Sequence, residues 1–186
     1  GFVAYIPGGG IFHSAVGDLI ADSLNRYTTV FAAAPGLTQL EINVVHWLKR
    51  MVGFPIEAGG FLTTGGSLAN FSAVVTARNE KLPENFLDGT LYVSDQIHHS
   101  IGKAAALAGF PAHNVRRIGV DRRFRIRVDE LEETIRSDRK AGRQPFLIVG
   151  SAGTTNTGAV DDLGSLVGIA RRYGLWLHVD AAYGGF

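Results

Sequence analysis

Hydrophobic positions along the chain fall into two patterns, helical spacing and short unbroken apolar runs. Residues 11–27 place apolar side chains at helical spacing, which predicts a first helix. Thr38 and Glu41 match a capping box and predict that a second helix begins there and ends near Gly53 and Pro55. From residue 59 onward, strand-length apolar runs alternate with helical segments. The predicted strands cover residues 59–66, 90–95, 115–120, 145–151 and 175–180, and the predicted helices cover residues 67–81, 98–109, 128–142 and 162–174.

This alternation of strands and helices predicts an α/β fold. Strands that are apolar on both faces are typical of a mainly parallel sheet with helices on both faces. In such sheets, ligands bind at the carboxyl ends of the strands. Polar clusters follow predicted strands at residues 63–67, 94–100, 151–158 and 180–185. We therefore expect a ligand site at this edge of the sheet.

Composition narrows the class of protein. The chain has 186 residues, of which 46% are hydrophobic and 19% charged, as in a globular domain. Its net charge of +1 gives no reason to expect nucleic acid or an anionic membrane as a partner, and the absence of cysteine excludes disulfides and thiolate catalysis. No apolar run reaches the roughly 20 residues of a membrane span. We expect a soluble cytoplasmic protein, and the abrupt ends of the sequence indicate a fragment of a larger one.

Asp180 ends the last apolar run, and a carboxylate in that place needs a partner. Along a strand, His178 and Asp180 face one side while Leu177 and Val179 face the other. Burying a carboxylate is costly unless a cation pairs with it. A protonated pyridine nitrogen, a metal ion or a neighbouring arginine would serve. A capping role in the following turn is the simpler alternative.

Two other clusters offer groups that bind anions and polar ligands. Gly66 and Ser67 lie at a turn into a helix, where backbone N–H groups, the helix dipole and a hydroxyl bind anions. Thr154 and Thr155 add hydroxyls on a loop that faces the same edge, although plain turn chemistry also explains them.

His98 supplies an aromatic ring at the same edge. It follows Asp95 and Gln96 at a strand end and suits ring stacking or acid–base chemistry, whereas His99 is expected to be a cap or a surface group. An anion holder, a stacking ring, hydroxyls and an acid for a ring nitrogen are together what pyridoxal phosphate requires. The sequence therefore predicts this cofactor, with Asp180 paired to its pyridinium.

Three motifs then carry a family resemblance. SDQIHHSIGKAA, SAGTTNTGAVDDL and LWLHVDAAYGG resemble the group II pyridoxal-phosphate-dependent decarboxylases, and the aromatic-L-amino-acid decarboxylase type is the most similar. The resemblance extends over nearly the whole chain, from YIPGGG through APGLTQLE and HWLKRMVGFP. It implies an aspartate-aminotransferase-like (fold type I) large domain, a homodimer, pyridoxal 5'-phosphate as cofactor, and amino-acid decarboxylation.

The resemblance also implies roles for single residues of the cofactor site. Gly66 and Ser67 would hold the phosphate. His98 would stack over the pyridine ring, and Ala182 would pack against the opposite face of that ring.

Further implied roles concern catalysis and the substrate. Asp180 would pair with the ring nitrogen, and Thr155 would lie beside the ring and the substrate carboxylate. Substrate contacts would come from Pro7 and Gly8, and from an aromatic side chain near Phe31 that reaches across the dimer. The small residues around Gly8 leave room for a bulky ring, so we expect tryptophan, tyrosine or dopa as substrate.

The sequence departs from the family pattern in one respect. The family's Schiff-base lysine lies downstream of the motif that ends this chain, and none of the chain's own lysines matches it. We therefore expect residues 1–55 to be a helical segment leading into the large domain and residues 56–186 to be part of that domain, without the Schiff-base lysine region or the C-terminal small domain. Such a fragment is expected to be inactive alone. The lysines are Lys49, Lys81, Lys103 and Lys140.

Alternatives remain open in three classes. The first alternative is another enzyme of the same fold: a glutamate or diaminobutyrate decarboxylase, a carbon–carbon lyase or an aromatic aldehyde synthase. A metal-dependent hydrolase would use His178 and Asp180 with His98 and Asp95. A nucleic-acid-binding module would use the arginines, but RRFRIRV alternates as an edge strand with one solvated face does. These arginines are Arg116, Arg117, Arg122, Arg123, Arg125 and Arg127.

Overall fold

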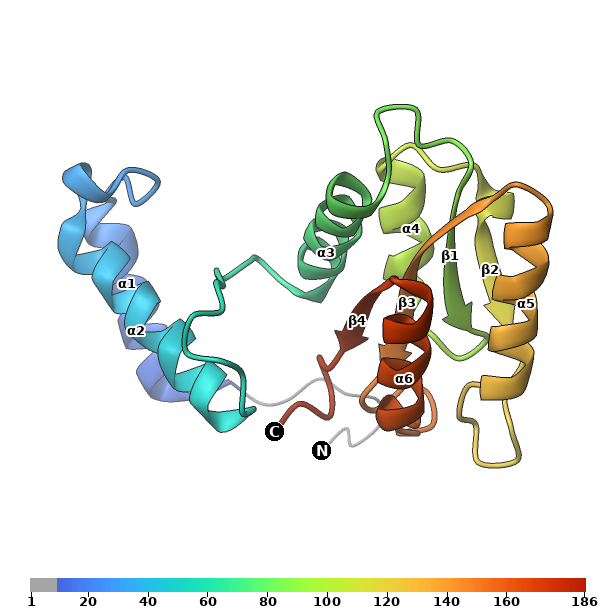
Figure 1. Cartoon of the computed structure of the whole chain (residues 1–186). Helices are drawn as coiled ribbons and strands as arrows, with labels where there is room; N and C mark the ends of the chain where they lie inside the picture. Colours follow the sequence, from blue (N-terminus) through green and yellow to red (C-terminus); the bar gives the residue numbers. More distant parts are fainter. Residues whose placement is uncertain (1–9) are drawn as a thin grey trace. The chain divides into compact units, whose positions relative to one another are not determined.

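A computed structural model describes residues 10–186 of the chain (Figure 1). The chain divides into two compact units, one ending at Leu62 and the other spanning Thr63–Gly185. The predicted boundary at residue 55 separates a helical segment from the large domain of a longer protein. It is a different kind of boundary from the one at Leu62 and stays a prediction. Within residues 10–186, no helix combines the length and the apolar character that crossing a membrane requires.

The first unit is helical. It contains α1 (Phe12–Leu24), the short 3-10 helix η1 (Phe31–Ala33) and α2 (Pro35–Met51). None of the residues of α1 is buried, and Lys49 is the buried residue of α2. The Lys49 Nζ donates to the backbone oxygens of Ile56 and Ala58 at 2.8 and 2.6 Å, so it ties the following loop to α2.

The start of α2 differs from the predicted capping box. The helix begins at Pro35, because proline fits the first helical position, where its missing N–H costs nothing. Thr38 therefore lies inside the first turn, and its hydroxyl donates to the Ala34 oxygen at 3.0 Å. The Glu41 carboxylate accepts from the Leu62 N–H at 2.9 Å instead of capping the helix.

The second unit is a parallel sheet with helices on both faces, as predicted (Figure 1). The strand order is β2-β1-β3-β4, and every pair is parallel. The strands are β1 (Gly89–Ser94), β2 (Val115–Ile118), β3 (Gln144–Ser151) and β4 (Trp176–Asp180). The helices are α3 (Gly66–Lys81), α4 (Ser100–Leu107), η2 (Ala112–Asn114), α5 (Val128–Lys140) and α6 (Leu163–Tyr173).

A hydrophobic core lies on each face of this sheet. Leu91 and Val93 of β1 pack with residues of α3 and α4, whereas Tyr92 between them packs with residues of α5 and α6. Successive side chains of a strand point to opposite faces, so an unbroken apolar strand fills both cores. This explains why the strands of the chain are continuous apolar runs.

Two predicted strands are absent from the structure. Residues 59–65 form a loop with which no described strand pairs, and Gly66 already begins α3. RRFRIRV is a tight turn, because the Asp121 carboxylate accepts the N–H groups of Arg123 and Arg125 at 2.7 and 3.0 Å. Val120 and Ile126 form one isolated antiparallel β-bridge, and the segment is not part of a described strand. The edge-strand prediction was therefore wrong.

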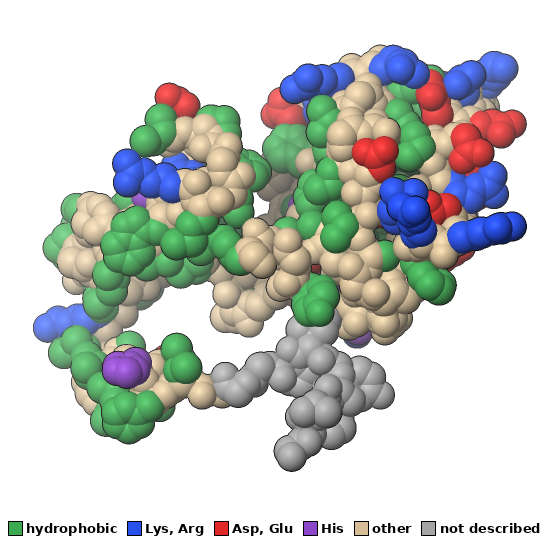
Figure 2. Space-filling view, turned by 90° about the horizontal axis from the view of Figure 1, so that it is seen from below, with side chains coloured by type: hydrophobic (Ala, Val, Ile, Leu, Met, Phe, Trp, Pro, Cys, Tyr) green, Lys and Arg blue, Asp and Glu red, His purple; other side chains and the backbone are tan. Residues whose placement is uncertain are grey.

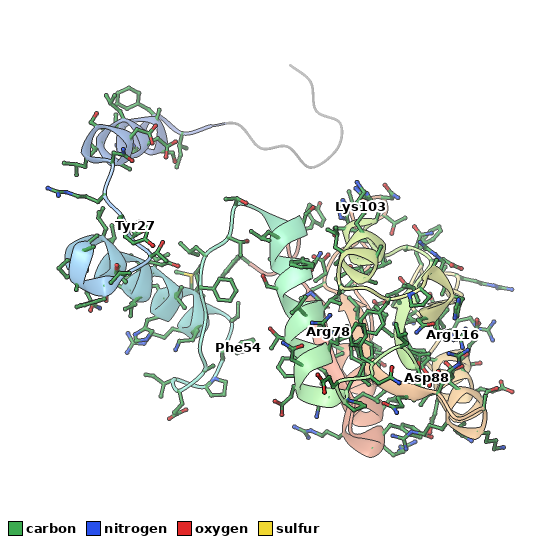
Figure 3. The ribbon with its side chains drawn as sticks, turned by 90° about the horizontal axis from the view of Figure 1, so that it is seen from above. Tyr27, Phe54, Arg78, Asp88, Lys103 and Arg116 are labelled. Carbon is green, nitrogen blue, oxygen red and sulfur yellow. The ribbon has the colours of Figure 1, made fainter. Side chains whose placement is uncertain are left out.

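The arginines of this region are dispersed among acids. Arg116, labelled in Figure 3, bonds the buried Asp138 at 2.6 Å, and Arg125 bonds Asp121 at 2.8 Å. Figure 2 shows Lys and Arg side chains interspersed with Asp and Glu over this part of the surface. Arginines paired in this way form a mixed-charge surface rather than a continuous basic patch.

Candidate active site

Asp180 lies at the carboxyl end of β4, where two N–H groups hold its side chain. Its Oδ1 accepts from the Ala182 N–H at 3.2 Å, and its Oδ2 accepts from the Asn70 Nδ2 at 3.0 Å. The ion pairs of the described residues do not include Asp180. The carboxylate therefore keeps acceptor capacity and negative charge for a further partner.

His178 lies on the same face of β4 as Asp180, as the alternation predicted. Its Nε2 lies 2.7 Å from the Asn70 Oδ1, so both β4 side chains contact the same amide of α3. Burial lowers the pKa of His178, and the nearby Asp180 charge opposes this effect only in part. His178 is therefore neutral at pH 7.

His98 follows β1 and is half-buried. Its Nδ1 lies 2.8 Å from the Ser100 Oγ and accepts from the Ser100 N–H at 3.3 Å. The His99 ring is exposed, and its centroid lies 4.1 Å from that of the His98 ring. The neighbouring His98 lowers the pKa of His99.

The start of α3 borders the segment that follows β4. A Cβ added at Gly66 would lie 3.8 Å from the Cβ of Ala182, so the two residues are separated by ordinary van der Waals distance. Gly66, Ser67 and Ala182 are all exposed. The positive end of α3 is thus open to solvent beside the residues that hold Asp180.

The loop after β3 packs tightly against the segment after β4. The Ala152 N–H donates to the Asp180 backbone oxygen at 2.9 Å. A Cβ at Gly184 would lie 2.4 Å from the Ala152 oxygen, and one at Gly153 would lie 2.7 Å from the Tyr183 ring, so only glycine fits at these two places. The two glycines therefore bring the loops together at the sheet edge.

The two threonines of this loop differ in environment. Thr154 is buried, and its hydroxyl lies 2.6 Å from that of Thr157, so it serves the loop itself. Thr155 is exposed, and within the described part of the chain no hydrogen bond joins its side chain to the other predicted site residues. Of this pair, Thr155 is the hydroxyl that is available to a ligand.

The structure thus connects some predicted residues and leaves others apart. His98 and Asp180 are linked through Ser100 and Asn70, neither of which the sequence reasoning identified. A polar residue on the buried stripe of a helix was the signal that marked Asn70. Three of the four polar clusters follow strands, namely β1, β3 and β4, whereas residues 63–67 lead into the first turn of α3 and follow no strand.

The structure does not test the predicted substrate contacts. Pro7 and Gly8 are outside the described residues, and Phe31 belongs to the first unit, where it is exposed. Asp95, the suggested additional metal ligand, is exposed. Across residues 10–186, no three side chains from His, Asp or Glu form a metal-binding group.

These surroundings fit pyridoxal phosphate. An Asp180 carboxylate with no cationic partner among the described residues suits a protonated ring nitrogen, and the half-buried His98 ring suits stacking. The exposed start of α3, in van der Waals reach of Ala182, suits a phosphate. The residues around Asp180 are less suited to a metal ion, because the His178 Nε2 is already hydrogen-bonded to Asn70.

Comparisons with known proteins agree with this fit. The pyridoxal-dependent decarboxylase conserved domain matches residues 1–186. An aromatic-L-amino-acid decarboxylase from Bacillus atrophaeus is 39% identical over 183 residues, which cover 98% of this chain and 38% of the relative. A 4-hydroxyphenylacetaldehyde synthase from Rhodiola rosea is 34% identical over 196 residues, which cover 99% of this chain and 40% of the relative.

Solved structures show the same relationship. The crystal structure of Oryza sativa TDC with PLP and tryptamine matches with a TM-score of 0.92 at 30% identity, over 97% of this chain and 40% of that one. The chain therefore spans about two fifths of the length of these relatives, 38% and 40% for the two sequences above. The predicted fold type I architecture and the predicted cofactor of the family are confirmed. The chain belongs to the group II pyridoxal-dependent decarboxylase family.

Proposed function

We propose that the protein carrying this chain decarboxylates an L-amino acid to its amine and carbon dioxide, with pyridoxal 5'-phosphate as cofactor. The observation that carries this proposal is the Asp180 carboxylate, which Asn70 and the Ala182 N–H hold at the end of β4. In the described residues no ion pair neutralises it. A carboxylate held in this way suits a cationic ring nitrogen.

The remaining site residues take the roles that the family resemblance implied. The N–H groups of Gly66 and Ser67 bind the phosphate, because the first amides of a helix have no partner inside the helix. His98 would stack over one face of the ring, and Ala182 would pack against the other. Thr155 is exposed, and its hydroxyl would contact the ring and the substrate carboxylate.

The chemistry divides between cofactor and chain. When bound, pyridoxal phosphate supplies a protonated ring that withdraws electrons from the substrate α-carbon. Asp180 keeps the proton on the ring nitrogen. The bond between the α-carbon and the carboxyl carbon breaks, carbon dioxide leaves, and a proton replaces it on the α-carbon.

An aromatic substrate, namely tryptophan, tyrosine or dopa, is the finer part of the proposal. It is supported by the aromatic-L-amino-acid decarboxylase relative and by the tryptamine-bound structure named above. Pro7, Gly8 and Phe31 are the proposed substrate contacts.

The proposal includes a cytoplasmic homodimer without a nucleic-acid or membrane partner. Support for a dimer comes from the first unit, where hydrophobic side chains cover much of the visible face (Figure 2). Sedimentation of the full-length protein tests it, and a monomer at micromolar concentration would contradict it. The exposed large hydrophobic residues of α1 are Phe12, Val16, Leu19, Ile20 and Leu24.

We also propose that the cofactor-binding lysine is none of the chain's own lysines and that the 186-residue chain alone is inactive. Lys49 is buried and donates to two backbone oxygens, and Lys103, labelled in Figure 3, is exposed on α4. Lys81 and Lys140 end α3 and α5. Borohydride reduction of the full-length protein followed by peptide mass spectrometry should find pyridoxyl on a lysine outside this set. A label on any of the four would contradict this part of the proposal.

The deciding experiment measures carbon dioxide release from L-tryptophan, L-tyrosine, L-dopa and L-glutamate by the full-length protein. We expect release from the aromatic substrates with one amine formed per carbon dioxide. Release from glutamate alone, or from none of the four in protein that binds the cofactor, would refute the aromatic assignment.

An aldehyde synthase is the second candidate, because the Rhodiola rosea relative is 34% identical over nearly the whole chain. That reaction consumes oxygen and water and releases an aldehyde, carbon dioxide, ammonia and hydrogen peroxide. An oxygen electrode and an ammonia assay in the same reaction therefore separate the two candidates.

A further inference from the structure

Asn70 is a polar side chain on the buried stripe of α3. It is 4% exposed and shares this stripe with Val74 and Ala77. A buried amide needs hydrogen-bond partners. Among the described residues Asn70 has three partners, on two elements of the site: Ser100 of α4, and His178 and Asp180 of β4, at 2.9, 2.7 and 3.0 Å.

The chemistry of the partners determines which way the amide points. The Asp180 Oδ2 only accepts hydrogen bonds when ionised, so the NH2 group of Asn70 must face it. The Asn70 Oδ1 then faces His178, and an oxygen only accepts, so the His178 Nε2 must carry a hydrogen. Because burial lowers the pKa of His178, this ring is neutral and its Nδ1 has no hydrogen.

The second hydrogen of the same NH2 group determines the orientation of His98. It donates to the Ser100 Oγ, whose own hydrogen is then free to donate to the His98 Nδ1. The Ser100 N–H faces the same nitrogen at 3.3 Å. With donors on that side, the His98 Nδ1 accepts, so the ring carries a hydrogen on Nε2.

We infer that Asn70 is a positioning residue that holds the Asp180 carboxylate and, through Ser100, the His98 ring in one fixed arrangement for the pyridoxal ring. This inference rests on the proposed function. Within residues 10–186 each oxygen of the Asp180 side chain has one donor, so rotation of the carboxylate breaks a hydrogen bond. The same amide reaches His98, so the groups for the ring nitrogen and for the ring face are coupled.

The test uses the full-length apo-protein and two readouts, the dissociation constant of pyridoxal phosphate by fluorescence titration and the imidazole nitrogen signals of ¹⁵N-histidine-labelled protein. Asn70→Leu removes the hydrogen bonds of the Asn70 amide to Ser100, His178 and Asp180. Ser100→Ala removes only the hydroxyl that joins Asn70 to the His98 ring. Asn79→Ala on the same helix is the control, because Asn79 is exposed and contacts Arg78.

The expected outcomes differ between the variants. Asn70→Leu should weaken cofactor binding about tenfold to a hundredfold and move the signals of both His98 and His178, since hydrogen bonds to charged groups are lost. Ser100→Ala should move the His98 signals and leave those of His178 in place. Asn79→Ala should change neither readout.

Three results would overturn the inference or its basis. Unchanged binding and unchanged histidine signals in a folded Asn70→Leu variant would overturn the positioning role. If that variant does not fold, Ser100→Ala decides, and unmoved His98 signals would overturn the coupling. A wild-type protein that does not bind pyridoxal phosphate would refute the proposed function, whereas the histidine signals of the apo-protein would still test the hydrogen-bond arrangement around Asn70.

Discussion

Asp161 joins the end of β3 to the turn at residues 120–127, and its replacement tests the energetics of the site loops. Its side chain accepts from the Ile126 N–H at 2.7 Å and from the Ser151 N–H at 2.8 Å. The residue is only 3% exposed, and burial raises the pKa of its carboxyl. No ion pair within residues 10–186 includes it.

The cost of losing this carboxylate follows from the two amides. In Asp161→Ala, the N–H groups of Ile126 and Ser151 stay buried without their acceptor. Each such group costs about 1–3 kcal/mol, so the variant should lose about 2–6 kcal/mol of stability. Asp161→Asn keeps the shape but turns one acceptor into a donor, which should cost about 1–3 kcal/mol.

Urea unfolding of the full-length protein and hydrogen exchange provide the assay. Asp162→Ala is the matched control, because Asp162 is exposed and caps α6 by accepting from the Ser165 N–H at 3.1 Å. Loss of that cap should cost about 0.5–2 kcal/mol. Exchange at Ile126 and Ser151 should accelerate in Asp161→Ala and not in the control. Asp161→Ala could destabilise the protein no more than Asp162→Ala and leave these two amides protected from exchange. In that case the Ile126 and Ser151 N–H groups do not depend on the Asp161 carboxylate for their stability.

Three further predictions concern the site. Asp180→Asn should weaken pyridoxal phosphate binding about tenfold to a hundredfold, because a hydrogen bond between charged groups is lost. Fluorescence titration measures the dissociation constant, and an unchanged value would contradict the pairing of Asp180 with the ring nitrogen. Gly184→Ala should cost about 1–3 kcal/mol in urea unfolding, since its Cβ would lie 2.4 Å from the Ala152 oxygen, whereas Gly168→Ala, with open space around it, should not destabilise. The pKa of His178 is lowered in the folded chain, so the unfolded chain binds the proton first as pH falls. Stability should therefore decrease below about pH 6.5, and this decrease should be smaller in His178→Gln.

The sheet and its helices were predictable because their signals are local. Unbroken apolar runs such as Leu91–Val93 fill two cores, and amphipathic helices cover them, so the order of elements follows from spacing alone. The errors arose where a distant or capping group took the backbone's hydrogen bonds. Asp121 closes RRFRIRV into a turn, Glu41 takes the Leu62 N–H, and Pro35 begins α2 before Thr38.

The site was predictable only in part, for the same reason. The sequence shows that a carboxylate at the end of an apolar strand needs a partner, but it does not show how much of that need the chain itself meets. Asn70 lies 110 residues from Asp180 and 30 from Ser100, and no spacing rule connects them. In the structure, an amide N–H and a backbone N–H satisfy one position on each oxygen of Asp180, and neither neutralises its charge. No ion pair within residues 10–186 meets the remaining charge, and a pyridinium is a partner that the neighbouring His98, Ala182 and start of α3 suit.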